Sequence, residues 1–426
     1  MENTDYRPRI ADKLLEEHLS AFGAVCVEGP MWCGKTSTAI RQAESVCMIA
    51  DPRDNFATRH RVSLDINFAF ADASAPHLID EWQEFPALWD AAKYYVDSHP
   101  GHGKLILTGS STPPTKGVMH SGAGRIADFR MRPMSLWESG ASEGKVSLEA
   151  VCNGEDTGIV TNRRPELSEL VELVVRGGWP GSIGLPLRAA AKIPVAYVGR
   201  LLNRKLPGME DFPHDRHKIE LLLRSLARNE ATMAGITTIR RDISEADGVE
   251  IDDKTLTAYL ASLDRLFVTE NIRPFSPSLR SGIRIKQSEK RRFCDPSIAV
   301  ALLKATPARL ERDLNTLGLL FESLVLRDLL CYAEAFGASV FHYRDYENRE
   351  ADAVIEMPDG EWTAVEVKLG VNQEEAAAGN LLDLRRRIMA KGGHPPKSLA
   401  IIVGLSSAAY RRPDGVYVLP ITALKP

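Results

Sequence analysis

Residues 24–110 alternate short apolar runs with segments whose apolar positions recur at helical spacing. The candidate strands are AVCVE (24–28), SVCMIAD (45–51), HLIDEW (77–82) and KLILTGS (104–110). Before the last of these, PALWDAAKYYVDSH (86–99) opens with proline and predicts a helix. Strands that alternate with helices predict crossover connections and a parallel sheet covered on both faces.

The rest of the chain has a different pattern. Residues 140–166 are polar and contain glycine, which predicts a linker or an exposed insertion. Long helical patterns then dominate to about residue 300, as at 217–231 and 252–272. The region from 314 begins with a helical pattern at 314–337 and continues as strand-like runs. In a chain of 426 residues we expect three domains, at 1–165, 166–300 and 301–426.

Composition narrows the class of protein. The chain is 44% hydrophobic and 26% charged with a formal net charge of -4, which is typical of a soluble globular protein and leaves room for a local basic face. No stretch approaches the roughly 18–20 uninterrupted apolar residues that a membrane helix needs, and the N-terminus lacks the apolar core of a signal peptide. The six cysteines form no Cys-x-x-Cys pair, which argues against structural zinc. We expect free thiols, a cytoplasmic protein and no membrane partner.

A glycine-containing loop follows the first apolar run. VCVEGPMWCGKTS (25–37) contains Gly29, four intervening residues, and then Gly34, Lys35 and Thr36. Glycines at these positions let the backbone curl so that its N–H groups point at phosphate oxygens. Lys35 is expected to reach the β- and γ-phosphates and the Thr36 hydroxyl to ligate Mg²⁺, while the following helix N-terminus favours the anion. The spacing predicts a nucleoside triphosphate site.

Two later strands offer polar residues for the same site. HLIDEWQ (77–83) ends its apolar run at Asp80 and Glu81. Asp80 is expected to hold Mg²⁺ through water, and Glu81 to polarise the attacking water, as in ATPases that hydrolyse rather than transfer phosphate. LILTGSS (105–111) offers Thr108 or Ser110 beside the γ-phosphate. Acidic residues also end strands, and small polar residues also form turns, without any such role.

SGAGRIADFRMRPMS (121–135) contains three arginines, Arg125, Arg130 and Arg132. An arginine brought to the γ-phosphate, in cis or from a neighbouring copy, would complete the charge stabilisation. We take Arg125 as the candidate, although most arginines are simply solvated. A trans-acting arginine requires an oligomer, which the sequence leaves open.

A second group of candidate residues lies near the C-terminus, in READAVIEMPDGEWTAVEVKLG (349–370). Asp352 lies on one predicted strand, and Glu366 and Lys368 share a face of the next, because alternate residues of a strand point the same way. A hairpin between the strands would place Asp352 opposite them, and Glu322 on the preceding helix would add a carboxylate. Two carboxylates with a lysine are suited to Mg²⁺-dependent phosphodiester cleavage. The alternative is an amphipathic hairpin with a solvated polar face.

The middle region ends in a basic stretch that follows a helix and a short strand. Its basic residues are Arg273, Arg280, Arg284, Lys286, Lys290, Arg291 and Arg292. A winged-helix protein would use such residues on DNA phosphates. The alternatives are a solvated basic loop and a helical interdomain module.

The order of these features resembles a family of uncharacterised bacterial and archaeal AAA-type ATPases. Its members pair an N-terminal P-loop domain with a C-terminal domain of unknown function similar to the PD-(D/E)xK restriction-endonuclease fold. The matching stretches are GPMWCGKTS, LIDEWQEFPALWDAAKYYVD, LILTGSS, GRIADFRMRPMSLWE, RGGWPGS (176–182), RRFCDPSIAVALL (291–303), LGLLFESLVLRDL (317–329) and READAVIE…WTAVEVKLG. The resemblance implies an α/β protein: an ATPase domain with a parallel sheet, a helical, winged-helix-like middle domain and a restriction-endonuclease-like α/β domain.

The resemblance also implies roles for individual residues. ATP is expected at Gly29, Gly34, Lys35, Thr36 and Ser37. Mg²⁺ and water are expected at Asp80 and Glu81, with Gln83 completing an Asp-Glu-x-Gln pattern, and Arg125 matches a Gly-Arg element. Asp352, Glu366 and Lys368 match the nuclease-like motif, with Glu322 as its helix carboxylate. The chain departs from the family in the loop interior Met-Trp-Cys (31–33), and in a first nuclease half-motif that lacks the usual proline before Asp352.

Three functions compete on this evidence. The first is an ATP-hydrolysing protein whose nucleotide state controls a nuclease-like, DNA-directed C-terminal module. The second is a nucleotide-gated binding or regulatory switch, whose C-terminal fold is a non-catalytic scaffold for DNA or protein partners. The third, a small-molecule kinase, is disfavoured because Asp80-Glu81 suits water activation and no acceptor pocket is evident.

Overall fold

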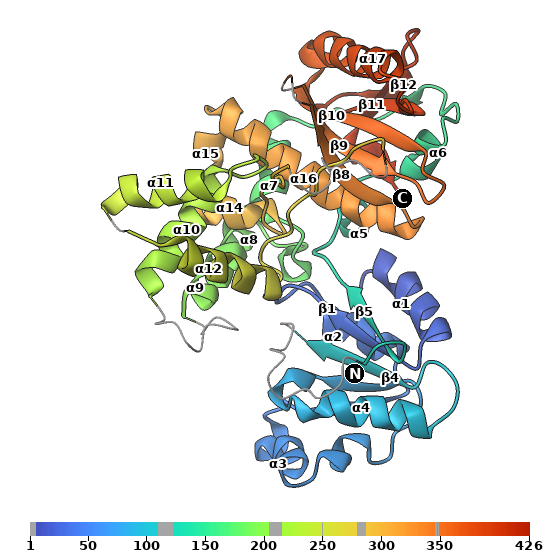
Figure 1. The fold of residues 1–426 in the computed structure, drawn as a ribbon, viewed down its shortest axis with the longest axis vertical. Helices are drawn as coiled ribbons and strands as arrows, with labels where there is room; N and C mark the ends of the chain where they lie inside the picture. The colour runs from blue at the N-terminus through green and yellow to red at the C-terminus, as the bar shows by residue number, and fades with distance from the viewer. Residues whose placement is uncertain are drawn as a thin grey trace. The chain divides into compact units, whose positions relative to one another are not determined.

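The computed structural model of the chain divides into two compact units, coloured along the chain in Figure 1. The structure describes residues 6–109, 122–203, 215–248, 250–278, 287–345, 347 and 349–426, with the backbone alone at position 54. Unit 1 comprises Met1–Pro133, Lys205–His214 and Ala258–Val268, and unit 2 comprises Met134–Arg204, Asp215–Thr257 and Thr269–Pro426. Four residues named above, Ser110, Arg280, Arg284 and Lys286, lie outside the described residues. The boundaries of the three predicted domains stay a prediction.

Unit 1 is built on a five-stranded parallel sheet. Its strands are β1 (Ala24–Glu28), β2 (Ser45–Met48), β3 (His77–Asp80), β4 (Leu105–Gly109) and β5 (Ile126–Arg130). They lie in the order β2-β3-β4-β1-β5, and each neighbouring pair is parallel. This confirms the predicted parallel sheet. It also brings the carboxyl ends of β1, β3 and β4 to one edge, where ligands of such sheets bind.

Both faces of this sheet are covered, because successive side chains of a strand point to opposite sides. Ala24 and Cys26 of β1 pack into one core, which Trp82 shares, while Val25 and Val27 pack into a second core on the other face. Of the described α-helices, those wholly within unit 1 are α1 (Ile10–Ala21), α2 (Lys35–Gln42), α3 (Ala57–Leu64) and α4 (Ala87–Ser98). Its 3₁₀ helices are η1 (Arg53–Phe56), η2 (Ile66–Phe70) and η3 (Trp82–Glu84).

Unit 2 contains a helical part that follows the predicted helical patterns. Its helices are α7 (Leu167–Arg176), η4 (Pro180–Ser182), α8 (Leu187–Ala190), α9 (Lys192–Asn203), α10 (Arg216–Arg228), α11 (Ile236–Asp247), α14 (Pro296–Leu302) and α15 (Pro307–Leu310). Helix α12 (Asp253–Arg265) begins in unit 2 and ends in unit 1. Segment 290–293 is paired on both sides, since Lys290 bridges Ile272 and Arg291 bridges Thr232.

A seven-stranded sheet forms the other part of unit 2, in the order β7-β12-β13-β11-β10-β9-β8, where β7 is Val160–Thr161. From residue 314 onward, the elements in chain order are α16 (Leu314–Ala335), β8 (Ser339–Arg344), β9 (Glu350–Glu356), β10 (Trp362–Gly370), η5 (Val371–Gln373), α17 (Glu374–Ala390), β11 (Ser398–Leu405), β12 (Ala408–Arg411), β13 (Tyr417–Pro420), η6 (Ile421–Ala423) and β14 (Leu424–Lys425). Strands β8, β9 and β10 are antiparallel neighbours, and β10 is parallel to β11. Val403 of β11 packs in the core that α17 completes, whereas Gly404 approaches Phe321 of α16 on the opposite face.

The expectation of a linker or exposed insertion at 140–166 is wrong. The segment forms β6 (Val146–Ser147), α6 (Leu148–Cys152) and β7 (Val160–Thr161). Helix α5 (Leu136–Ser139) directly precedes the segment. Strand β7 pairs with β12 at the edge of the seven-stranded sheet, and β6 pairs with β14 to form a two-stranded sheet. The physical reason lies in a few apolar positions, Val146, Leu148, Val151 and Cys152, which are buried although the surrounding sequence is polar.

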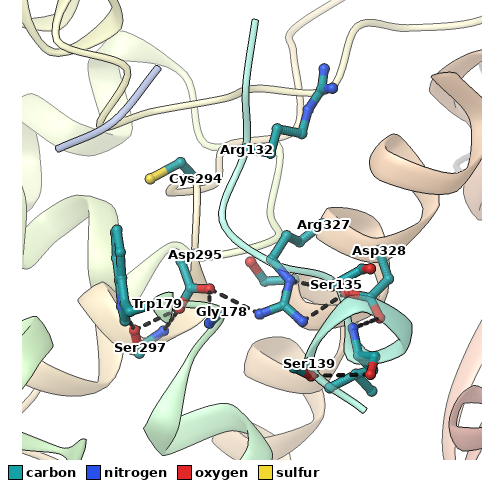
Figure 2. Close-up of polar contacts among 12 residues, drawn as sticks. Arg132, Ser135, Ser139, Gly178, Trp179, Cys294, Asp295, Ser297, Arg327 and Asp328 are labelled. Atoms are coloured by element: carbon teal, nitrogen blue, oxygen red, sulfur yellow. Dashed lines mark hydrogen bonds and ion pairs between the residues drawn. The ribbon is translucent and has the colours of Figure 1, made fainter. Parts of the chain in front are cut away.

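A buried arginine joins several of the stretches that carried the family resemblance (Figure 2). Arg327 of α16 pairs with Asp295 at 2.9 Å and with Asp328 at 2.7 Å, and all three side chains are almost fully buried. Asp295 accepts the backbone N–H of Gly178, and Asp328 accepts that of Leu136. Gly178 has no room for a side chain, because a Cβ there would lie 2.2 Å from the carbonyl oxygen of Met134. These stretches therefore meet at a buried ion-pair and hydrogen-bond cluster of unit 2.

All six cysteines are buried free thiols, as the sequence predicted. Within the described part of the chain, no helix has the length and apolar character needed to cross a membrane.

Candidate functional site

The predicted phosphate loop joins β1 to α2 and depends on two glycines with positive φ. Gly29 has φ 152° and Gly34 has φ 103°, values that side chains rarely tolerate. At Gly29, a Cβ would also lie 2.1 Å from the carbonyl oxygen of Met131. Gly34 is the N-cap of α2, so Lys35 and Thr36 begin the helix at its positive end. Ser37 follows in the same first turn, which is where a bound phosphate would find backbone N–H groups.

Lys35 is folded back onto its own loop. Its ammonium donates to the carbonyl oxygens of Gly29 and Pro30, each at 2.9 Å, and the residue is only 7% exposed. In the described part of the chain it has no carboxylate partner at ion-pair distance. The charge therefore lies beside the loop interior, stabilised by backbone dipoles alone, where it is available to an anion.

Two predicted hydroxyl groups converge on the predicted carboxylate of Asp80. The hydroxyl of Thr36 donates to Oδ1 of Asp80 at 2.8 Å, and the hydroxyl of Thr108 donates to the same oxygen at 2.5 Å. The strand register explains this meeting, because Asp80 of β3 lies directly beside Thr108 of β4. A hydroxyl and a buried carboxylate this close form the oxygen-donor set that Mg²⁺ prefers. The residues present therefore fit the implied cation.

Glu81 follows at the end of β3 in a left-handed backbone conformation, with φ 58°. A non-glycine residue in this region costs about 1–3 kcal/mol and is found where a side chain must be aimed. Gln83 donates its side-chain amide to the Glu81 carboxylate. The Gln83 side chain packs closely against the last residue of β4, since a Cβ on Gly109 would lie 2.7 Å from the side-chain oxygen of Gln83. The Asp-Glu-x-Gln stretch is thus a compact turn at the sheet edge that carries the loop.

Arg125 lies at the other edge of the sheet. It precedes β5, whose first residue Ile126 pairs with Ala24 at the start of β1, while Arg130 pairs with Glu28 beside the loop. Its guanidinium donates to Asp97 at 2.9 Å, and the side chain is 51% exposed. Hydrogen bonds from Arg125 and Lys93 lower the pKa of the Asp97 carboxyl. The structure does not bring Arg125 to the phosphate loop of its own chain, because parallel strands place their two ends on opposite edges.

One residue that supports the loop was missed by the sequence analysis. The guanidinium of Arg9, which is 8% exposed, donates to the carbonyl oxygen of Cys33 at 2.9 Å and to that of Arg132 at 2.8 Å. Arg9 therefore ties the loop interior to the chain after β5. Its partners lie 24 and 123 residues away in sequence, so no local pattern reveals the contact.

The C-terminal candidates are brought together as the hairpin predicted. Strands β9 and β10 pair with Ala353 opposite Val365, which places Asp352 beside the end of β10 that carries Glu366 and Lys368. The Lys368 ammonium lies 2.5 Å from Glu366 and 3.6 Å from Oδ2 of Asp352. The backbone N–H of residue 367 donates to the same Asp352 oxygen at 2.8 Å.

Two further residues complete this carboxylate–lysine cluster, which we define as Lys290, Glu322, Asp352, Glu366 and Lys368. Glu322 reaches it from α16, as the family resemblance implied. Lys290 reaches it from the middle region, where the sequence suggested a contact with DNA phosphates, a solvated basic loop or a helical interdomain module. The Lys290 ammonium lies 2.5 Å from Glu322 and 4.0 Å from Oδ1 of Asp352, and it donates to the carbonyl oxygen of Asp352 at 3.0 Å.

Burial and mutual repulsion shape the electrostatics of the cluster. Burial, with the charge of Asp352 added, raises the pKa of Glu366 to about 7. Burial likewise raises the pKa of Glu322 to about 7, although Lys290 opposes the shift. Burial disfavours the charged form of Lys290, but the carboxylates of Glu322 and Asp352 outweigh it and raise the pKa of that lysine. Both lysines of the cluster are therefore cations that share a limited number of negative charges.

Comparison with known proteins identifies the N-terminal part. Residues 21–139 match the family model of an AAA domain, and this range holds the phosphate loop together with Asp80, Glu81 and Thr108. Residues 167–309 and 317–424 match two domains of unknown function, DUF8612 and DUF4143. The chain is also similar to the Walker-type ATPase PABY2304 of Pyrococcus abyssi, at 18% identity and a TM-score of 0.41, over 71% of this chain and 97% of that chain. No curated protein matches. Along the chain the matches thus run from an AAA domain through DUF8612 to DUF4143.

Proposed function

We propose that the chain binds ATP with Mg²⁺ at the phosphate loop and hydrolyses it. The observation that carries the proposal is the convergence of the Thr36 and Thr108 hydroxyls on Asp80, next to Gly34 and Lys35. A buried carboxylate and a hydroxyl at a helix N-terminus, beside a lysine with no acidic partner in the described part of the chain, are the groups that a nucleotide with its cation requires.

Each residue then has a defined task. Lys35 leaves its carbonyl partners and binds the β- and γ-phosphates, and the backbone N–H groups at the start of α2 bind the same anion. Thr36 and Asp80 hold the Mg²⁺, which supplies Lewis-acid stabilisation of the phosphate charge when bound. Glu81 accepts the proton of the attacking water, and its strained turn with Gln83 holds the carboxylate in place.

Steady-state ATP hydrolysis with Mg²⁺ tests this proposal. Lys35→Ala is expected to lose at least about a hundredfold in turnover, because a preorganised cation on the transferred phosphate is removed. Lys13→Ala is the matched control, since Lys13 is an exposed lysine of α1 in the same unit, and it should keep full activity. Equal turnover in Lys35→Ala and wild type would exclude hydrolysis at this loop.

A second copy of the chain is the proposed source of a catalytic arginine. Arg125 lies away from the loop of its own chain and is half exposed, which supports action in trans. We propose a homo-oligomer in which Arg125 of one copy reaches the nucleotide of the next. Mixing Arg125→Ala with Lys35→Ala should then restore part of the ATPase activity, because each variant supplies the group that the other lacks. If the mixture stays as inactive as its components, Arg125 does not act in trans.

The C-terminal half is proposed to be a nuclease-like, DNA-directed module under nucleotide control. The grouping of Asp352, Glu366 and Lys368 on paired central strands supports it, with α16 and α17 on opposite faces. In the middle region, the order α10, α11, α12 and then two paired segments at 269–272 and 290–293 supports a winged-helix-like arrangement. The oxygen donors of the cluster suit Mg²⁺, and Lys368 would stabilise the charge that develops on the phosphate.

A non-catalytic scaffold is the second candidate for this module. It is favoured by the ion pairs of the cluster, in which both lysines already neutralise the carboxylates that a metal would need. Nicking of supercoiled plasmid with Mg²⁺ or Mn²⁺, with and without ATP, separates the two functions. Cleavage that vanishes in Lys368→Ala supports the nuclease. ATP-dependent DNA binding with no cleavage under any of these conditions supports the scaffold.

A further inference from the structure

Lys290 differs from the other members of the carboxylate–lysine cluster in where it comes from. Its backbone belongs to the middle region and exchanges two 2.9 Å hydrogen bonds with Ile272, while its neighbour Arg291 pairs with Thr232. Only its side chain enters the cluster, where it is 4% exposed. A buried ammonium is costly unless it is paired, so its position there is a specific arrangement rather than a solvated charge.

The oxygens around this ammonium form a cation site. They are a carboxylate oxygen of Glu322 at 2.5 Å, the carbonyl oxygen of Asp352 at 3.0 Å and Oδ1 of Asp352 at 4.0 Å. Carboxylate and carbonyl oxygens are the donors that hard divalent cations use in proteins. Asp352 directs its other oxygen to Lys368, so it lies between two ammonium groups.

We propose that Lys290 is an internal cation that holds the metal position of this cluster, so that a divalent ion enters only when the lysine is withdrawn. The proposal rests on the nuclease-like function proposed above and adds its regulation. A lysine and a metal ion compete for the same oxygens, and their charges repel strongly at a separation of a few Å. Since the lysine is carried by the middle region, a movement of segment 290–293 controls the C-terminal site.

The surroundings of Lys290 agree with this position. The imidazole of His342 on β8 is fully buried, and burial together with the charge of Lys290 lowers its pKa to about 4. Glu350 at the start of β9 also acts on Lys290, and raises its pKa. Thus the low pKa of His342 keeps its imidazole neutral, while Glu322, Asp352 and Glu350 favour the positive charge of Lys290.

Direct Mn²⁺ binding by the full-length protein without nucleotide, measured by electron paramagnetic resonance, tests the proposal. Lys290→Met is expected to bind Mn²⁺ at least about tenfold more tightly than wild type, since one repelling charge is removed. The gain should disappear in Lys290→Met/Asp352→Asn, which places the ion in the cluster. Lys290→Arg should behave as wild type because it keeps the charge, and Lys391→Met, at an exposed lysine, serves as the control.

Two results would overturn the proposal: no gain of Mn²⁺ affinity in Lys290→Met, or a gain that survives Asp352→Asn. If Lys290→Met does not fold, Lys290→Gln removes the same charge, keeps the oxygens of Glu322 and Asp352, and decides by the same criterion. Plasmid nicking separates this proposal from the nuclease itself. Gained Mn²⁺ binding without cleavage contradicts the nuclease alone, while cleavage by wild type with no gain in Lys290→Met contradicts the lysine's role alone.

Discussion

The nucleotide site of unit 1 and the carboxylate–lysine cluster of unit 2 use the same residue types in opposite ways. In the first, Lys35 contacts backbone carbonyls and Asp80 contacts hydroxyls, so the described contacts leave the cation and the carboxylate unpaired with each other. In the second, each lysine lies 2.5 Å from a carboxylate. The first site is therefore prepared for a charged ligand, whereas the second has already neutralised its own charges.

Arg327 is a buried cation with a structural role, and its removal is expected to cause the largest loss of stability among the variants considered. Arg327→Met leaves Asp295 and Asp328 buried without their cation, and we expect a loss of about 5 kcal/mol in the unfolding free energy of unit 2. Urea denaturation followed by circular dichroism measures it. Arg312→Met, at an exposed arginine of the same unit, should change stability by less than about 0.5 kcal/mol. A similarly small loss in Arg327→Met would show that the buried ion-pair and hydrogen-bond cluster in Figure 2 does not hold the fold.

The two site lysines should differ in their effect on stability. Lys290→Met leaves Glu322 without its partner and is expected to cost about 3 kcal/mol. Lys35→Met removes only hydrogen bonds to carbonyl groups, and about 1 kcal/mol is expected. Lys290→Met/Glu322→Leu should recover most of its loss, because no charge remains unpaired. Equal losses of unfolding free energy in Lys35→Met and Lys290→Met would contradict the difference proposed between the two sites.

Glu230 shows what happens to a carboxyl group in unit 2 that is buried away from the cluster. It accepts hydrogen bonds from Ser323 and from the backbone N–H of Phe293, and burial raises its pKa to about 8. The folded state therefore keeps a proton that the unfolded state releases above about pH 4.3, so this group's stabilising contribution declines as pH rises toward 8. Glu230→Gln should flatten the fall in unfolding free energy between pH 5 and 8. An unchanged slope would show that Glu230 is not the group responsible.

Arg125→Ala should leave stability nearly unchanged, because its ion pair with Asp97 is exposed. The same variant should nevertheless lose ATPase activity if Arg125 acts in trans. Thermal unfolding and ATP turnover of one preparation measure both quantities. Full turnover in Arg125→Ala would assign this arginine a surface role only.

The meeting of Thr36, Asp80 and Thr108 beside the phosphate loop could be predicted from sequence, because this geometry follows from strand order. Gly34, Lys35 and Thr36 are adjacent in the chain, and Asp80 and Thr108 end neighbouring parallel strands, so a motif and a sheet suffice. The hairpin of Asp352 and Glu366 was predictable for the same local reason.

Long-range contacts were not predictable in this way. Arg9 supports the loop through partners far along the chain, and Lys290 looked like one of several basic residues near a DNA-binding segment. Arg125 was the candidate for an arginine at the γ-phosphate, in cis or in trans, and it matches a Gly-Arg element of the family, but sequence spacing does not say which edge of the sheet it occupies. Such contacts depend on the packing of elements, which no periodic pattern encodes.

The most direct test of the account is Glu81→Gln, which keeps the shape of the side chain and removes its basic carboxylate. We expect this variant to bind a fluorescent ATP analogue with Mg²⁺ within about twofold of wild type, and to lose at least about a hundredfold in turnover. Binding without turnover would place water activation at Glu81 beside the phosphate loop. Wild-type turnover in Glu81→Gln would contradict the proposed hydrolysis site.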